Sequence, residues 1–308
     1  MSSVARIIFF VETPFNRRDY NRYGIEILQK NGFDVEAWDF SPFLHPHSAE
    51  PTSGFHVLDW SGLKQWRSRP EALAAISALD ASCVVVCIVA YGWESFAIYR
   101  ALSRVPVRYC IEMTNFIPGV GAVGNARSLL ARIGQTSLRK LPGVFFRRVP
   151  FRIWGIRPAT MMLAGGLQSI QKVFRRHWPW NHETKILWAH TLDYDLYLSE
   201  RDRPVSTDAK TGVFLDEYLP FHPDYDHWGL SPFSSAEAYY PALRRFFDFL
   251  EHEHGVRIVI AAHPHSRYED HPDYFDGRPV VKEKTMELVR KSGFVIAHSS
   301  TALKFAVL

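Results

Sequence analysis

Cysteine is scarce in this sequence, and its scarcity excludes a fold held together by disulfides. Only Cys83, Cys87 and Cys110 occur in 308 residues, and all three lie in apolar runs typical of buried strands. An odd number of cysteines without metal-ligand spacing indicates reduced core thiols. Such thiols are typical of the reducing cytoplasm, so we expect a cytoplasmic protein.

Long apolar runs are also missing. The stretches 5–11 and 83–91 are too short to cross a bilayer or to form a secretory signal, and Glu12 interrupts the first. Hydrophobic residues make up 47% of the chain and charged residues 22%, as in ordinary globular proteins. We expect a soluble chain, or one that is peripheral to the inner membrane.

Acidic residues are absent between Met113 and His182, so this segment is strongly basic. Such a segment attracts anionic lipid headgroups, phosphates or polyanions, and aromatic residues interleaved with its arginines favour a membrane surface. A basic surface over a buried aromatic cluster is the alternative. We take Arg147, Arg148 and Arg152 as candidate acceptor or membrane contacts. No recognition motif supports a nucleic-acid partner. The segment contains eleven basic residues: Arg127, Arg132, Arg139, Lys140, Arg147, Arg148, Arg152, Arg157, Lys172, Arg175 and Arg176.

Strand and helix patterns alternate along residues 1–200, which predicts an α/β, Rossmann-like domain with a parallel sheet. The basic segment forms an insertion at about 113–182. Expected strands cover 6–12, 33–40, 55–60, 82–91, 107–113, 158–164 and 185–190, with helices near 17–30, 71–80, 95–103 and 168–177.

A second Rossmann-like domain is expected over residues 211–308, after a polar linker at 199–211. Its expected strands are 212–216, 256–262, 278–281 and 294–298, and its expected helices are 237–253, 284–292 and 301–308. The chain ends at Leu308 inside an apolar helical pattern, about 100 residues into this domain. Because Rossmann-like domains are usually larger, we expect this domain to be incomplete.

Polar residues follow two predicted strands of the second domain. His263 and Pro264 end the strand 256–262, and His298 ends the strand 294–298. Ligands of open α/β sheets bind at this edge, where imidazole and hydroxyl groups can hold a phosphate. Ordinary turn and helix caps are the alternative interpretation. The candidate nucleotide-binding residues are His263, Pro264, His298, Ser299, Ser300 and Thr301.

Together with a helix containing residues 285–288, His263-Pro264 and Ser299-Ser300 resemble the nucleotide-binding domain of GT-B glycosyltransferases. The resemblance is nearest to bacterial enzymes with cytidine-activated donors, namely sialyltransferase-like and Kdo-transferase-like enzymes and teichoic-acid glycerophosphotransferases. It implies that the His-Pro histidine and the paired serines bind the donor phosphate. Segments 191–195 and 214–224 also resemble bacterial surface-polysaccharide biosynthesis proteins.

Several acids are candidates for catalysis. A glycosyl transfer needs a base for the acceptor hydroxyl, and Glu12, directly after the first strand, is favoured over Glu94 and Glu112. Asp216 and Glu217 resemble an acidic sialyltransferase motif that normally ends in glycine and lies in the other domain. Asp216 is therefore a candidate base, a contact to a ribose or substrate hydroxyl, or a solvated acid. We take Glu12, Asp216 and His263 as the catalytic candidates.

Two further motifs give weaker signals. Gly119–Gly124 matches the dinucleotide fingerprint in letters but follows the fifth strand rather than the first, so we interpret it as a loop. Asp193 and Asp195 have an Asp-x-Asp spacing, and paired histidines occur three times, yet no zinc signature is present. GT-B-like enzymes usually hold phosphates without metal. We expect no required cofactor or metal beyond the nucleotide-sugar donor, with a cytidine nucleotide favoured.

The sequence thus predicts a glycosyltransferase that moves a sugar from a nucleotide-activated donor to a surface-polysaccharide or lipid-linked acceptor. Two alternatives stay open. One is a cytidine-linked polyol phosphotransferase that uses the same phosphate contacts. The other is a non-catalytic scaffold protein of polysaccharide assembly.

Overall fold

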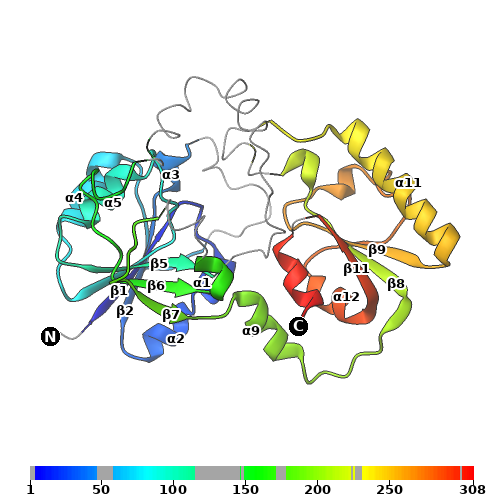
Figure 1. The fold of residues 1–308 in the computed structure, drawn as a ribbon, viewed down its shortest axis with the longest axis horizontal. Coiled ribbons are helices and arrows are strands. Elements are labelled where there is room, and N and C mark those ends of the chain that lie inside the picture. The colour runs from blue at the N-terminus through cyan, green and yellow to red at the C-terminus, as the bar shows by residue number, and fades with distance from the viewer. Residues whose placement is uncertain are drawn as a thin grey trace. The chain divides into compact units, whose positions relative to one another are not determined.

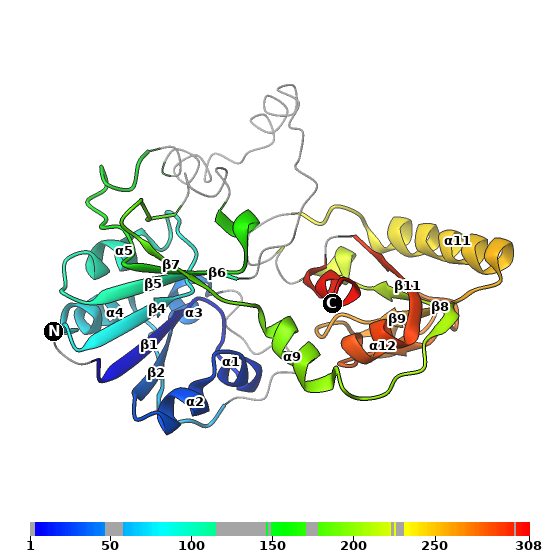
Figure 2. The same ribbon diagram turned by 60° about the horizontal axis from the view of Figure 1, so that its bottom comes forward.

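The computed structural model describes residues 4–46, 58–114, 146, 149–170, 178–222, 225, 231–298 and 300–308. These residues divide into two compact units: unit 1 extends to His190, and unit 2 runs from Thr191 to Leu308. Figures 1 and 2 show a sheet with flanking helices in each unit. Both sheets are parallel, so the predicted α/β class with two Rossmann-like sheets is confirmed.

Unit 1 contains a seven-stranded sheet in the order β3-β2-β1-β4-β5-β6-β7. This is the doubly wound order, in which the connections change direction beside the first strand. The change lies between β1 and β4, which are hydrogen-bonded neighbours. The strands are β1 (Arg6–Val11), β2 (Asp34–Asp39), β3 (Leu63–Gln65), β4 (Cys83–Cys87), β5 (Arg108–Met113), β6 (Met161–Ala164) and β7 (Lys185–Trp188).

Helices cover both faces of this sheet because alternate strand residues point to opposite sides. Phe9 and Val11 pack with Ile25 of α2 on one face, whereas Phe10 packs with Ile76 of α4 on the other. All three cysteines are buried and unpaired. The remaining elements of unit 1 are α1 (Arg17–Arg22), α2 (Ile25–Lys30), α3 (Ser41–Leu44), α4 (Arg69–Ser77), α5 (Phe96–Leu102) and the 3-10 turn η2 (Leu167–Ile170).

Two predictions for unit 1 need correction, and a third falls mostly outside the described residues. The helix expected over 17–30 is two helices, because Gly24 adopts a left-handed φ of 62° and ends the helical path between them. The third strand is β3 rather than 55–60; residues 58–60 form no strand, and 55–57 lie outside the described residues. Only the 3-10 turn η2 is seen at the start of the expected helix 168–177, and residues 171–177 lie outside the described part.

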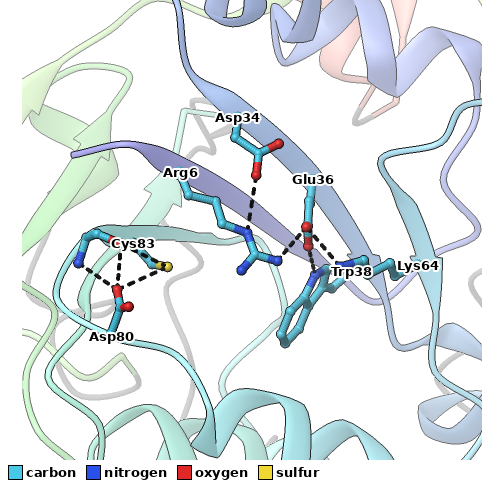
Figure 3. A network of polar contacts seen from close by, with 8 residues as sticks. Arg6, Asp34, Glu36, Trp38, Lys64, Asp80 and Cys83 are labelled. Atoms are coloured by element: carbon cyan, nitrogen blue, oxygen red, sulfur yellow. Dashed lines mark hydrogen bonds and ion pairs between the residues drawn. The ribbon is translucent and has the colours of Figure 1, made fainter.

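A polar network lies at the amino ends of β1 and β2 (Figure 3). The Glu36 carboxylate accepts hydrogen bonds from Arg6, from Lys64 Nζ at 2.8 Å and from Trp38 Nε1 at 2.6 Å. Burial opposes ionisation of Glu36, but these donors outweigh it and lower its pKa. The network therefore favours a charged carboxylate on the sheet face that carries α4.

Unit 2 contains a four-stranded parallel sheet in the order β10-β9-β8-β11. The first strand of the unit, β8, is central, so the connections change direction between β8 and β11. Phe214 packs with Tyr240 and Phe247 of α11 on one face, and Val213 packs with Val289 of α12 on the other. The elements are α9 (Leu192–Glu200), β8 (Asp208–Leu215), η3 (Leu219–Phe221), α11 (Ala236–His254), β9 (Arg257–Ala261), η4 (Tyr268–Asp270), β10 (Val280–Val281), α12 (Thr285–Lys291), β11 (Ser292–Ala297) and η5 (Thr301–Ala306).

Two expectations for unit 2 also change. The polar stretch 199–211 is not wholly a linker, because Glu200 ends α9 and Asp208–Thr211 begins β8. Those first β8 residues are polar but pair with neighbouring strands, through Asp208 with Ser292 and Thr211 with Arg257. The expected helix at 301–308 is the shorter 3-10 helix η5.

Candidate functional site

The carboxyl ends of β9, β8 and β11 lie side by side and form the candidate site. Leu215 of β8 pairs with Ala261 of β9 and with Ala297 of β11, so Asp216 and His298 each follow a paired strand end. His263 follows β9 two residues after Ala261. Neighbouring strands are about 4.8 Å apart, which places β9 and β11 about 10 Å from each other across β8. The structure thus brings His263, Asp216 and His298 to one sheet edge.

The turn after β9 fixes the ring of His263. The backbone N–H of His265 donates to His263 Nδ1 at 3.2 Å, so the neutral ring carries its hydrogen on Nε2. The Ser266 N–H and hydroxyl donate to the His263 carbonyl at 2.9 and 2.7 Å. His263 is half-buried, whereas Pro264 is exposed. The ring of His222 lies 5.0 Å from the His263 ring, measured between centroids.

Asp216 is buried at 4% exposure, and both of its carboxylate oxygens accept hydrogen bonds. Oδ1 accepts from the Tyr218 N–H at 3.0 Å, and Oδ2 accepts from the His263 N–H at 3.2 Å and the Tyr268 hydroxyl at 2.7 Å. Burial raises the pKa of this carboxyl despite those bonds. Asp216 therefore ties the His263 turn to β8, and its position favours an anchoring role over that of a solvent-exposed base.

Sequence reasoning missed the two tyrosines behind Asp216. The Tyr268 hydroxyl lies 3.2 Å from the Tyr240 hydroxyl of α11, which extends the chain from Asp216 into the core. Tyr268 is 5% exposed and Tyr240 is 1% exposed. Tyrosines in apolar surroundings look like ordinary core residues in a sequence, and only the fold places them against Asp216.

The β11 end of the site carries His298 and the residues after it. His298 is exposed, and its ring packs edge-on against Phe214, with 5.6 Å between centroids. The Ser300 hydroxyl accepts from the Ala302 N–H at 3.3 Å as a cap and can still donate its own hydrogen. Thr301 is exposed. Ser299 lies outside the described residues.

Glu12 lies in unit 1 directly after β1, beside the point where the strand connections change direction. Its Oε2 is 3.7 Å from His45 Nε2. Sequence reasoning missed the neighbouring Asp39, which ends β2, pairs with Val11 and is completely buried. Burial raises the pKa of Asp39, while Ser41 N–H donates to its Oδ1 at 2.8 Å. The signal available was an aspartate closing an apolar strand.

The other candidates of unit 1 lie at separate positions. Glu112 accepts from the Thr114 N–H at 2.6 Å and from the Thr114 hydroxyl, so local bonds occupy this acid. Glu94 and Arg152 are exposed. Arg147, Arg148 and the glycine-rich segment Gly119–Gly124 lie outside the described residues.

Metal and membrane features can be assessed only for the described part of the chain. Within it, no group of three or more His, Cys, Asp or Glu side chains is placed to hold a metal ion. Asp193, from the Asp-x-Asp segment, lies 3.5 Å from Lys304 Nζ within unit 2. None of the helices among these residues is both long and apolar enough to cross a bilayer.

A pocket of about 500 Å³ opens beside β10, the edge strand opposite β11 in the sheet of unit 2. Val280 and Lys282 of β10 and its flank form one side, and η4 with the following loop forms the other. Lys282 Nζ donates to the Ser266 carbonyl and lies 3.3 Å from Glu269 Oε2. Tyr268 lines this pocket and also donates to Asp216, which holds the His263 turn. The same tyrosine therefore contacts both the pocket and the candidate site.

Comparisons with known proteins assign no family to this chain. No protein-family model matches it, and no curated protein matches it. Solved structures that it resembles include an alpha-glucosyltransferase in complex with UDP and a 13-mer DNA (14% identity, 96% of this chain and 72% of that one, TM-score 0.44). Another is a UDP-N-acetylglucosamine 2-epimerase (12% identity, 98% of this chain and 75% of that one, TM-score 0.43). A third is Acinetobacter baumannii MurG (10% identity, 95% of this chain and 72% of that one, TM-score 0.38). Similarities of this size decide neither reaction nor substrate.

Proposed function

We propose that the chain is a glycosyltransferase that moves a sugar from a nucleotide-activated donor to a surface-polysaccharide or lipid-linked acceptor. The observation that carries this proposal is the convergence of His263, Asp216 and His298 at the carboxyl edge of β9, β8 and β11. Open parallel sheets bind their ligands at this edge, next to the point where the strand order reverses. In unit 2 that point lies between β8 and β11.

The donor phosphates would bind between the two histidine-bearing strand ends. His263 would contribute its imidazole, and Ser300 and Thr301 would contribute hydroxyl groups. Ser299, the residue before Ser300 in the sequence, would add a further hydroxyl. These donors would stabilise the negative charge that develops on the departing nucleotide. They supply the role that a metal has in other transferases, so no metal or further cofactor is required, and the family resemblance favours a cytidine nucleotide.

Glu12 would act as the base in this proposal. The acceptor oxygen forms a bond to the anomeric carbon while the bond from that carbon to the phosphate oxygen breaks, and the acceptor proton passes to the Glu12 carboxylate. His45, 3.7 Å from Glu12, would orient that carboxylate. Asp216 would serve the donor side by holding the His263 turn.

The acceptor would meet the basic segment that contains Arg147, Arg148 and Arg152. Aromatic residues interleaved with these arginines fit a lipid-linked acceptor at an anionic membrane surface. We therefore place the protein in the cytoplasm, peripheral to the inner membrane, with no nucleic-acid partner.

Calorimetric titration with CMP, CDP, UDP and GDP tests the proposal. We expect one nucleotide, of cytidine by preference, to bind the wild-type chain and to lose affinity in His263→Ala. His252→Ala is the matched control, because its side chain is 86% exposed at the far end of α11. Absence of binding by all four nucleotides would overturn the proposal and favour a scaffold protein of polysaccharide assembly.

A further inference from the structure

Tyr239 carries a buried hydroxyl group that has no partner among the described residues. The residue is only 8% exposed. Burying a hydroxyl without a hydrogen bond destabilises the folded state, and such groups are rare in folded proteins unless a ligand, ion or water satisfies them. The group therefore requires a physical explanation.

The position of Tyr239 indicates a ligand. It lies in the first turn of α11, and its ring centroid is 5.8 Å from that of His298, which ends β11. His298 is exposed and packs on Phe214 of β8. Tyr239 thus lies at the β8–β11 junction, where the strand order of unit 2 reverses and where open α/β sheets bind ligands.

The charges around Tyr239 select the kind of ligand group. Burial, and then the negative charges of Asp216 and Glu217, raise the pKa of Tyr239 far above neutrality, so its hydroxyl keeps its hydrogen and can donate. The same carboxylates make the immediate surroundings of the Tyr239 hydroxyl unfavourable for an anionic ligand group. A ligand hydroxyl suits the position better, because it can accept from tyrosine and donate to a carboxylate or imidazole.

We propose that Tyr239 binds a sugar hydroxyl of the ligand at the β8–β11 junction, beside the phosphate contacts. This proposal rests on the proposed function, since it adds a polyol-binding residue to the same nucleotide-sugar site. The hydroxyl belongs either to the ribose of the nucleotide or to the sugar that is transferred. Both sources present the same chemistry, and the experiment separates them.

Tyr239→Phe tests the proposal because it removes only the hydroxyl. If that group has no protein partner, the midpoint of thermal unfolding of the unliganded chain should stay the same or rise. Tyr240→Phe is the contrasting stability control: its neighbouring hydroxyl lies 3.2 Å from that of Tyr268, so its removal should lower the midpoint. A fall in the midpoint for Tyr239→Phe would assign the hydroxyl a structural role and overturn the proposal.

Binding of Tyr239→Phe is then measured by calorimetry with CMP, CDP, UDP and GDP, their 2′-deoxy and 3′-deoxy forms, and CMP-N-acetylneuraminate and UDP-glucose. Loss of one neutral hydrogen bond weakens affinity by about three- to tenfold. If the contact is to the ribose, the deoxy nucleotide that lacks the contacted hydroxyl should bind the wild type more weakly than the parent nucleotide does. That deoxy nucleotide should bind the wild type and Tyr239→Phe with equal affinity. If it is to the transferred sugar, only the nucleotide sugars should lose affinity. Tyr20→Phe, altered at an exposed hydroxyl in unit 1, should bind like the wild type.

The experiment distinguishes failure of the proposed role of Tyr239 from failure of the proposed function. If the wild type binds a nucleotide or nucleotide sugar and Tyr239→Phe binds every ligand equally well, the role of Tyr239 is refuted and the proposed function stands. If the wild type binds none of these ligands, both proposals fall together.

Discussion

Replacing Tyr268 by Phe should destabilise unit 2 and weaken nucleotide binding together. The Tyr268 hydroxyl donates to the Asp216 carboxylate at 2.7 Å and lies 3.2 Å from the Tyr240 hydroxyl. A hydrogen bond to a charged group contributes about 1.5–3 kcal/mol. Asp216 keeps its bonds from the Tyr218 and His263 N–H groups. We therefore expect the free energy of unfolding to fall by about 2–3 kcal/mol at neutral pH.

The pH dependence of this loss is its most specific feature. Burial raises the folded-state pKa of Asp216 above its ordinary value, so this carboxyl binds a proton more tightly in the folded protein than in the unfolded chain. The stability that Asp216 contributes is full below its unfolded pKa and is lost as pH rises through the folded pKa. The Tyr268 bond lowers that folded pKa, so its removal raises the pKa further. The variant should thus lose more stability at pH 7.5 than at pH 4.5.

Urea unfolding of the full chain at both pH values, followed by circular dichroism, measures this difference. Tyr20→Phe is the matched control and should change stability by less than about 0.5 kcal/mol, because its hydroxyl is exposed. An equal loss at both pH values, or a larger one at pH 4.5, would refute the argument that Tyr268 stabilises the charged form of Asp216.

Three further predictions concern other parts of the chain. Gly293→Ala should lower the free energy of unfolding by about 1–3 kcal/mol, because an added Cβ would lie 2.5 Å from the Ala209 carbonyl oxygen of β8. An added Cβ at Gly255 would meet no atom within 4 Å, but this residue has a left-handed φ of 59°, so Gly255→Ala should lower the free energy of unfolding by about 1 kcal/mol. Urea unfolding of both glycine variants compares the two losses. Glu36→Gln should lower the free energy of unfolding at pH 7 but progressively less below pH 4.5. The reason is that the pKa of Glu36 is lowered in the folded protein, so the stability contributed by its charged form disappears as pH falls. Similar losses of unfolding free energy at pH 3 and pH 7 would contradict this. Glu12→Gln should reduce the transfer rate about 10²–10⁴-fold in a product assay while nucleotide affinity stays unchanged, and an unaffected rate would exclude Glu12 as the base.

Much of the fold could be predicted from the sequence because buried parallel strands are nearly continuous apolar runs. Residues 82–91 and 256–262 were recognised in this way and contain β4 and β9. The short strand β3 was misplaced, since Leu63–Gln65 has only one apolar residue and no periodicity. The break at Gly24 was not predicted, because the apolar pattern continues through this residue and a pattern of side chains does not indicate a left-handed φ.

The candidate site was only partly visible in the sequence. His263 and His298 could be predicted because each follows an apolar run and therefore lies at a strand end. That the two histidines lie near each other at one edge of the sheet depends on the strand order, which places β8 between β9 and β11. Tyr239 and Tyr268 could not be found, since a tyrosine in an apolar setting gives no sign of where its hydroxyl lies. Only the packing of α11 and η4 on the sheet shows this.

Hydrogen–deuterium exchange of the full chain, with and without a saturating nucleotide sugar, tests most directly that the donor binds at the carboxyl edge of β9, β8 and β11. We expect slower exchange in peptides that cover 261–268 and 296–303, and no comparable change at 270–282 around the β10 pocket. His263→Ala at the same ligand concentration should lose this protection. Protection confined to the β10 pocket or to unit 1, or no protection with any nucleotide sugar, would contradict the assignment of the donor site.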